Sequence, residues 1–312
     1  MVGVNQVTML FLLIVTGYFV KKRKMVSDVV VKDLSSLVIN VALPAFIVTS
    51  MTFDFSMEVL INSGVLLLIS FFVYAGAILF SRLYTRLIGV EGKSRDIHRF
   101  ICVFSNVGYM GYPVVYAVFG DLGVFYAAIY NLSFNLLTWS YGVHLLDREG
   151  RENGKNAHVP LYKRLLNLFN PSLVAVVIGF TLFLTSRSLP AIIFDTCKMI
   201  GATVTPLSMM CIGFILSEVD TSDIVKDYKV MLTSLIRLVV IPMVVFLALK
   251  LLGKEGFLIT IPVLLTAMPA AANTAIIAVR YNSDYKLASK AVFVSTLMSI
   301  VTIPFLIQLL LR

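Results

Sequence analysis

Nine residues from Ser105 to Pro113, SNVGYMGYP, lie inside an apolar segment that runs from about Phe100 to Phe119. That segment is long enough to cross a hydrocarbon layer about 30 Å thick. Gly108, Gly111 and Pro113 weaken a helix here, because glycine has no side chain to pack and proline lacks a backbone donor. At membrane depth, freed backbone groups persist only inside protein or beside a water-filled cavity. The stretch therefore predicts a binding site, and a simple proline kink is the alternative.

The composition indicates that the chain is a membrane protein, so these breaks are expected at membrane depth. Hydrophobic residues make up 59% of the 312 residues and charged residues only 14%, whereas soluble domains carry about 25% charge. The mean hydropathy is +0.92. Apolar runs of a length that can span a bilayer occur ten times, at 4–20, 35–53, 59–81, 100–119, 123–146, 168–186, 190–217, 229–250, 257–279 and 287–311. We therefore expect an all-α polytopic membrane protein with ten transmembrane helices.

The positive charges predict the orientation of these spans. Loops after the odd-numbered spans contain 20 of the 26 Lys and Arg residues, whereas the opposite side contains four. Cytoplasmic loops carry the positive excess, so both termini are expected outside the cytoplasm and the 147–167 loop inside it. Because the net charge of +9 is spread over alternate loops, it indicates a lipid bilayer and no nucleic acid as the partner.

The 147–167 loop separates two halves of five spans each, residues 1–146 and 168–312. An odd number of spans makes the halves enter the bilayer in opposite directions, and such inverted repeats are typical of secondary transporters. Span 9 contains Pro269 and Asn273, and span 4 contains Asn106 and Pro113. Interrupted segments at matching positions predict a substrate site near the middle of the membrane.

Polar side chains within the spans are the candidate ligands. Asn106 and Asn273 are expected to face inward, because an unpaired amide in lipid is costly; each holds a ligand, caps a half-helix, or does both. Asn131 and Asn135 lie four residues apart and share a helical face, where ligand contact competes with packing between helices. Arg237 lies well inside span 8, and it either binds a carboxylate or snorkels toward the cytoplasm.

Signatures of catalysis and of cofactor binding are missing from the sequence. It contains no HExxH, GxSxG, P-loop or GxGxxG motif, and its three cysteines lie in apolar segments without CxxC spacing. We therefore expect neither an enzyme nor an ATP-driven pump, with no cofactor and no metal site. The acidic residues lie near span ends, so uncoupled transport or coupling through backbone carbonyls agrees with the sequence at least as well as coupling to sodium or protons through a buried carboxylate.

Several motifs resemble one known family, in the same order and over nearly the whole chain. They include INVALPAFIVTSM in span 2, SNVGYMGYPVVYAVFG in span 4, YNLSFNLLTW in span 5, NPSLVAVVIGF in span 6 and AMPAAANTAII in span 9. These are similar to the auxin efflux carrier family, which includes plant PIN-FORMED transporters and bacterial carboxylate carriers. The resemblance implies that spans 4 and 9 unwind and cross at Pro113 and Pro269, and that Asn106 and Asn135 line a carboxylate pocket. It also implies a scaffold of spans 1, 2, 6 and 7, through which a homodimer would form.

The short 147–167 loop and the alanine after Pro269, Ala270, distinguish this chain from the plant members and favour a bacterial-type carrier. We expect an alternating-access carrier in the cytoplasmic membrane that moves small organic anions by export or uniport, since an anion that leaves a cell with a negative interior needs no coupling ion. One alternative is a sodium- or proton-coupled organic-anion symporter with an architecture like that of the bile-acid symporters. The other is a channel, which needs a continuous polar stripe through the bilayer.

Overall fold

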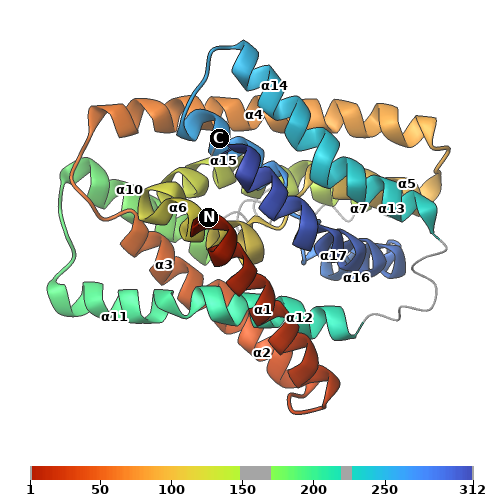
Figure 1. Cartoon of the computed structure of the whole chain (residues 1–312), viewed down its shortest axis with the longest axis horizontal. Helices are drawn as coiled ribbons and strands as arrows, with labels where there is room; N and C mark the ends of the chain where they lie inside the picture. Colours follow the sequence, from red (N-terminus) through yellow and green to blue (C-terminus); the bar gives the residue numbers. More distant parts are fainter. Residues whose placement is uncertain (1, 148–169, 219–226, 311–312) are drawn as a thin grey trace.

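The computed structural model describes residues 2–147, 170–218 and 227–310. Within these ranges the chain is helical, apart from turns and one isolated antiparallel bridge between Ser105 and Ala270. With η denoting π-helical segments, the elements are α1 (Val2–Lys22), α2 (Asp28–Leu37), η1 (Val38–Ala42), α3 (Leu43–Ser50), α4 (Met57–Leu87), α5 (Gly92–Val103), η2 (Val107–Gly111), α6 (Tyr112–Leu137), η3 (Thr138–Gly142), α7 (Val143–Leu146), α10 (Pro171–Thr185), α11 (Ala191–Ala202), α12 (Val204–Ser217), α13 (Tyr228–Leu235), η4 (Ile236–Val240), α14 (Ile241–Leu251), α15 (Phe257–Thr266), α16 (Thr274–Arg280) and α17 (Tyr285–Leu310) (Figure 1). The all-α prediction is confirmed for these residues.

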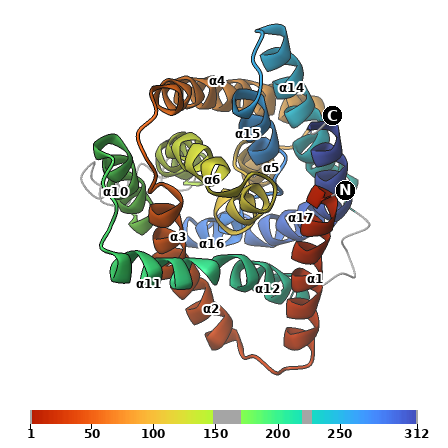
Figure 2. The same ribbon diagram turned by 60° about the vertical axis from the view of Figure 1, so that its left-hand side comes forward.

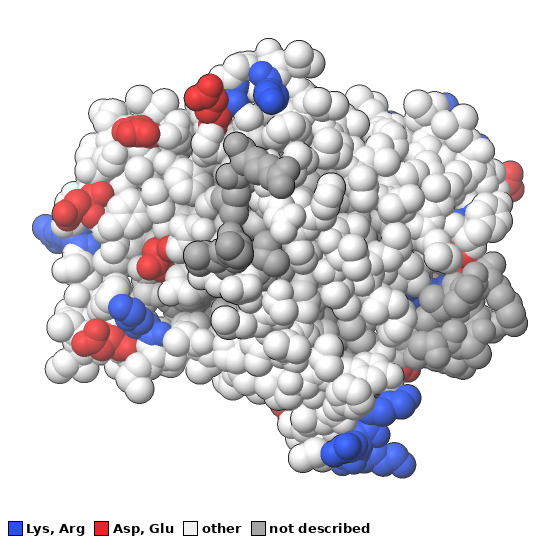
Figure 3. All heavy atoms as spheres, viewed as in Figure 1, with Lys and Arg blue, Asp and Glu red and all other residues white. Residues whose placement is uncertain are grey.

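Six stretches of the described chain are long and apolar enough to cross a membrane. They are Asp28–Ser50, Met57–Leu87, Val107–Leu146, Ala191–Ser217, Tyr228–Leu251 and Tyr285–Leu310. Shorter apolar helices, α10 and α15, coincide with two further predicted spans. On the face shown in Figure 3, the charged side chains of the described residues lie toward the rim, and the described residues nearer the middle are uncharged. This distribution suits a multi-pass membrane protein.

The stretch Val107–Leu146, built around α6, lies in the middle of the helices that surround it (Figure 2). Its most apolar window is 61% buried, the largest share among the six stretches. Helices α1, α3, α4, α10 and α15 all contact α6. Because protein encloses this stretch, its polar side chains can face other side chains rather than lipid.

The loop predicted between spans 4 and 5 is reduced to a sharp bend at one glycine inside α6. Gly120 has φ of 64° and ψ of −156°, so the helix axis changes direction there although the hydrogen-bonded helix continues on both sides. Glycine suits this position because side chains with a Cβ rarely adopt positive φ. The two predicted spans therefore meet without an extended connection.

Helices α5 and α15 stop midway, and the residues that follow them pair with each other. The interruptions are residues 104–106 and 267–273. Two backbone hydrogen bonds join them, from Asn106 N–H to Pro269 O at 2.8 Å and from Ala271 N–H to Phe104 O at 3.2 Å. This pairing satisfies backbone groups that a broken helix leaves without partners. An interruption is thus present in each half of the chain, and the two lie side by side.

Pro113 does not lie at the interruption, which corrects the expectation that the chain breaks at this residue. Pro113 is the second residue of α6 and lies two residues after the end of η2, and Pro44 and Pro242 follow η1 and η4 at the same spacing. In each case the residue before the proline bonds to the carbonyl five residues back rather than four. The wider π turn makes room for the proline ring, which in a regular α-helix would clash with the carbonyl four residues earlier. Pro269, by contrast, does lie within its interruption.

Candidate functional site

A polar cavity of about 200 Å³ lies beside the paired interruptions. It is lined by Ile39, Leu43, Ser105, Asn106, Val107, Gly108, Tyr109, Tyr112, Asn131, Phe134, Asn135, Thr138, Trp139, Asn170, Ser172, Ala271, Ala272 and Asn273. Five of these side chains are asparagines, contributed by segments far apart in the sequence. None of the described lining residues is Asp, Glu, Lys, Arg or His. The wall therefore presents amides and hydroxyls, which can donate to a ligand oxygen without introducing a fixed charge.

Asn106 begins the helical stretch that continues through η2 into α6. Its side-chain Oδ1 accepts a hydrogen bond from the N–H of Tyr109 at 3.2 Å, so the residue acts as an N-cap. Its backbone N–H is used in the bond to Pro269, and the residue is only 4% exposed. Because the cap uses Oδ1, the group of this side chain left to donate to a ligand is Nδ2. Capping and ligand contact are therefore compatible roles for Asn106.

Asn135 is held in a chain of hydrogen bonds that reaches α10. Its Nδ2 donates to the backbone carbonyl of Asn131 at 3.3 Å, and its Oδ1 accepts from Nδ2 of Asn170 at 3.1 Å. Asn170 in turn caps α10, since its Oδ1 accepts from the N–H of Leu173 at 2.8 Å. The amide of Asn135 is thus fixed in orientation at the cavity wall. A ligand that binds there would use its remaining donor or acceptor capacity, or would displace Asn170.

Two polar atoms of the cavity wall are buried without a partner in the described part of the chain, Oδ1 of Asn131 and Oγ1 of Thr138. The Nδ2 of Asn131 bonds to the hydroxyl oxygen of Tyr112 at 3.1 Å. A half-turn of the Asn131 amide would exchange its donor and acceptor, so the side chain can present either group to the cavity. Since an unsatisfied buried polar group costs about 1–3 kcal/mol, a ligand that bonds these atoms is stabilised by satisfying them.

The glycines of the SNVGYMGYP stretch have different surroundings. A Cβ added to Gly108 would meet nothing within 4 Å, whereas one added to Gly111 would lie 3.1 Å from Cδ2 of Leu265. Gly108 therefore opens onto the cavity, and Gly111 allows η2 to pack closely on α15. Ser105 and Asn273 also line the cavity, Ser105 through the bridged backbone and Asn273 at the start of α16.

Arg237 does not line this cavity, which corrects its placement among the substrate-binding residues. The side chain is 1% exposed, so it does not snorkel either. Its Nη1 donates to the carbonyl of Cys102 at 2.8 Å and its Nε to the carbonyl of Met268 at 3.3 Å. These carbonyls lie in the last turn of α5 and just after α15. Arg237 therefore binds the backbone where both broken helices end.

A second cavity, of about 450 Å³, lies near the start of α6. Its lining includes Pro113 and Phe46, whereas the polar cavity is lined by the nearby Tyr112 and Leu43. The beginnings of α6 and α3 thus separate the two cavities. The second cavity also contains Asp121, whose carboxylate accepts a hydrogen bond from Oγ of Ser50 at 2.8 Å.

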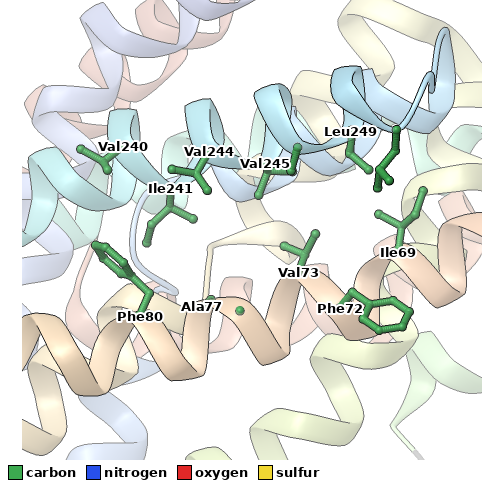
Figure 4. A pocket seen from close by; sticks show the side chains of 13 residues that line it. Ile69, Phe72, Val73, Ala77, Phe80, Val240, Ile241, Val244, Val245 and Leu249 are labelled. Atoms are coloured by element: carbon green, nitrogen blue, oxygen red, sulfur yellow. The ribbon is translucent and has the colours of Figure 1, made fainter.

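An apolar groove of about 320 Å³ runs between α4 and α14 (Figure 4). Val73 and Ala77 of α4 face Ile241 and Val245 of α14 across it. Every lining residue is aliphatic, phenylalanine or glycine, so the groove offers no side-chain hydrogen bond. It suits hydrocarbon and not a polar ligand.

Several lining residues were not among the predicted site residues, and Asn170, Tyr112 and Trp139 are three of them. Asn170 precedes Pro171, and an asparagine before a proline is a signal for the start of a helix. That signal locates a cap but not the neighbour that the cap reaches. Trp139 belongs to the motif YNLSFNLLTW, where its spacing of four from Asn135 places both on one helical face.

Comparisons with known proteins agree over almost the entire chain. The model of a family described as membrane transport protein matches residues 2–307. An uncharacterized transporter of Methanothermobacter thermautotrophicus is 30% identical over 297 residues, which cover 94% of this chain and 93% of the relative. An uncharacterized transporter of Methanocaldococcus jannaschii is 25% identical over 97% of both chains, and the uncharacterized transporter YfdV of Escherichia coli is 25% identical over 95% of this chain and 93% of its own. The chain therefore belongs to the membrane transport protein family, the auxin efflux carrier-like transporters.

Proposed function

We propose that the protein is an alternating-access carrier of small organic anions, and that the polar cavity is its substrate site. The observation that carries the proposal is the cluster of five asparagines at the paired interruptions. Amide and hydroxyl donors can hold a carboxylate, as Nδ2 of Asn106 and Oγ1 of Thr138 would here. Asn131, Asn135 and Asn273 complete the donor set. A cavity of about 200 Å³ limits the substrate to a small molecule.

The proposed architecture is a ten-helix inverted repeat, with residues 1–146 and 168–312 as the two halves and the 147–167 loop between them. The matched interruptions at 104–106 and 267–273 support it. Apart from Asp147, this loop lies outside the described residues. In the proposal the two broken helices cross, both termini lie outside the cytoplasm, and the loop lies inside it.

Two cavities on either side of the beginnings of α3 and α6 suit alternating access. The polar cavity includes Asn170, next to the predicted cytoplasmic loop, and the second cavity includes Gln6 and Lys198, on the predicted outer side. We therefore assign the polar cavity to the cytoplasmic half of the path and the second cavity to the outer half. An anion that leaves a cell with a negative interior gains about 2.3 kcal/mol per charge per 100 mV, so export can proceed without a coupling ion.

Counterflow in proteoliposomes tests the carrier. Vesicles loaded with an unlabelled carboxylate, chosen by thermal stabilisation of the purified protein, are expected to accumulate the labelled compound transiently in choline buffer. A flux that does not saturate and shows no such exchange would indicate a channel. Accumulation that requires sodium would instead indicate a symporter.

Matched glycine substitutions test the location of the site. Gly108→Leu is expected to fill the polar cavity and to weaken carboxylate binding by roughly tenfold or more, since its side chain enters open space and leaves the fold intact. Gly76→Leu, which enters open space in the apolar groove, is expected to leave binding unchanged. Isothermal titration of both variants makes the comparison. Equal effects of the two substitutions would contradict the assignment.

A further inference from the structure

Arg237 is a buried cation without an acidic partner. Its side chain is 1% exposed, and within the described residues no Asp or Glu lies at ion-pair distance from it. A guanidinium does not lose its proton in proteins. Burying an unpaired charge is very costly, so the surrounding backbone has to compensate for it.

The compensation comes from the C-terminal ends of two helices. The last carbonyls of a helix have no intrahelical partner, and each helix end carries roughly half a negative charge. The carbonyl of Cys102, in the last turn of α5, accepts a hydrogen bond from Nη1 of Arg237, and the carbonyl of Met268, two residues past the end of α15, accepts one from Nε. Two such ends sum to about one negative charge, which a single guanidinium balances. The two carbonyls therefore accept the hydrogen bonds of Arg237 at the place where the helix ends balance its charge.

In many secondary transporters, unwound carbonyls and half-helix C-terminal ends coordinate the coupling sodium ion or proton. We propose that Arg237 is a tethered cation that takes the place of a coupling cation, so that this carrier binds and moves its anion without sodium. The inference rests on the proposed carrier function and concerns how its site is held and charged. Arg237 is here a positioning residue, since it contacts the backbone rather than the ligand.

The chain connects this cation directly to the polar cavity. Ser105 and Asn106, which line the cavity, follow Cys102 by three and four residues, and Ala271 follows Met268 by three. The backbone hydrogen bonds that join the two interruptions lie between the contacts of Arg237 and the cavity wall. Arg237 therefore fixes the two segments whose continuation forms the cavity wall, and its charge moves with them.

Two variants of similar length separate charge from packing. Arg237→Lys keeps a cation, and Arg237→Met keeps an unbranched side chain without charge. In detergent and without any carboxylate, Arg237→Met is expected to melt at least about 5 °C below Arg237→Lys. In Arg237→Ala, whose short side chain leaves the site open, guanidinium ions at millimolar concentration should raise the melting temperature, whereas choline, which is too large to fill the site, should not. Wild-type protein should melt at the same temperature in sodium, potassium and choline chloride.

The same proteins are then titrated with the carboxylate that stabilises the wild type most. Wild-type affinity is expected to be equal in sodium and choline, and that of Arg237→Ala to become dependent on a small cation. The proposal is overturned if Arg237→Met is as stable as Arg237→Lys, if guanidinium does not stabilise Arg237→Ala, or if wild-type affinity changes more than about fivefold with sodium. If Arg237→Met fails to fold while Arg237→Lys folds, the result supports the proposal, because the two side chains differ mainly in charge. The melting experiment contains no carboxylate, so it holds even if the proposed substrate class is wrong.

Discussion

Asn106→Asp is expected to abolish the binding of small carboxylates while keeping the helix cap that Asn106 forms. Aspartate keeps a side-chain oxygen that can accept from the N–H of Tyr109, as Oδ1 of Asn106 does at 3.2 Å, and Asn and Asp are equally good N-caps. The substitution removes the Nδ2 donor and places a negative charge beside the anion. We expect affinity to fall at least about 100-fold, which corresponds to roughly 2.7 kcal/mol. Thermal-shift titration with a panel of carboxylates measures the effect.

Asn106→Ser is the matched control for this substitution. Serine caps a helix as well as asparagine does but is shorter and neutral, so its loss of affinity should be smaller than that of Asn106→Asp. The melting temperature of Asn106→Ser without ligand should remain close to that of the wild type, whereas Asn106→Asp should melt lower, because its carboxylate is placed at a residue that is only 4% exposed. A carboxylate that stabilises Asn106→Asp as strongly as the wild type would place the binding site elsewhere.

Gly213→Val is expected to prevent folding of most of the protein. A Cβ added to Gly213 of α12 would lie 2.1 Å from the carbonyl oxygen of Ile14 and 2.6 Å from the backbone nitrogen of Tyr18, both in α1. Gly17 of α1 faces α12 as closely, with its added Cβ 2.3 Å from the carbonyl oxygen of Met210. Small residues allow such close approach of helix backbones in membranes. Since backbone cannot move aside as a flexible side chain can, the cost should reach about 3 kcal/mol or more.

The control for Gly213→Val is the same substitution at Gly64 of α4. A Cβ there would meet nothing within 4 Å, so the yield of monodisperse protein in size-exclusion chromatography should equal that of the wild type. Gly213→Val should give mainly aggregate in the same assay. Equal yields for the two variants would mean that α1 and α12 are not packed as closely as the structure has them.

The sequence was sufficient to predict which segments are helical and that two of them are interrupted. Apolar length marked the spans, and polar residues with prolines marked the breaks in spans 4 and 9. The position of one break differs, because the sequence places it at Pro113. In the structure the ring of Pro113 is accommodated by the π turn η2, and the chain departs from helix at residues 104–106. A π turn depends on hydrogen bonds that residue identities alone do not specify.

The long-range hydrogen-bond partners in the candidate site could not be predicted from the sequence either. Asn170 bonds to Asn135, which is 35 residues earlier, and Arg237 bonds to a carbonyl 135 residues away. Burial depth suggested only two roles for Arg237, a carboxylate ligand or a snorkelling side chain. Its actual partners are main-chain carbonyls, which every residue carries and no motif distinguishes. Spacing therefore predicted which side chains are unusual, and tertiary structure determined what they contact.

A fluorescence titration of Trp139 tests the central claim most directly. Trp139 is the only tryptophan of the chain and it lines the polar cavity, so its emission reports on a ligand there without an added label. A carboxylate that stabilises the protein should change this emission saturably, with the same midpoint as the thermal shift, and the change should be lost in Asn106→Asp. Thermal stabilisation without any change in Trp139 emission, retained in Asn106→Asp, would contradict the assignment of the cavity as the anion site.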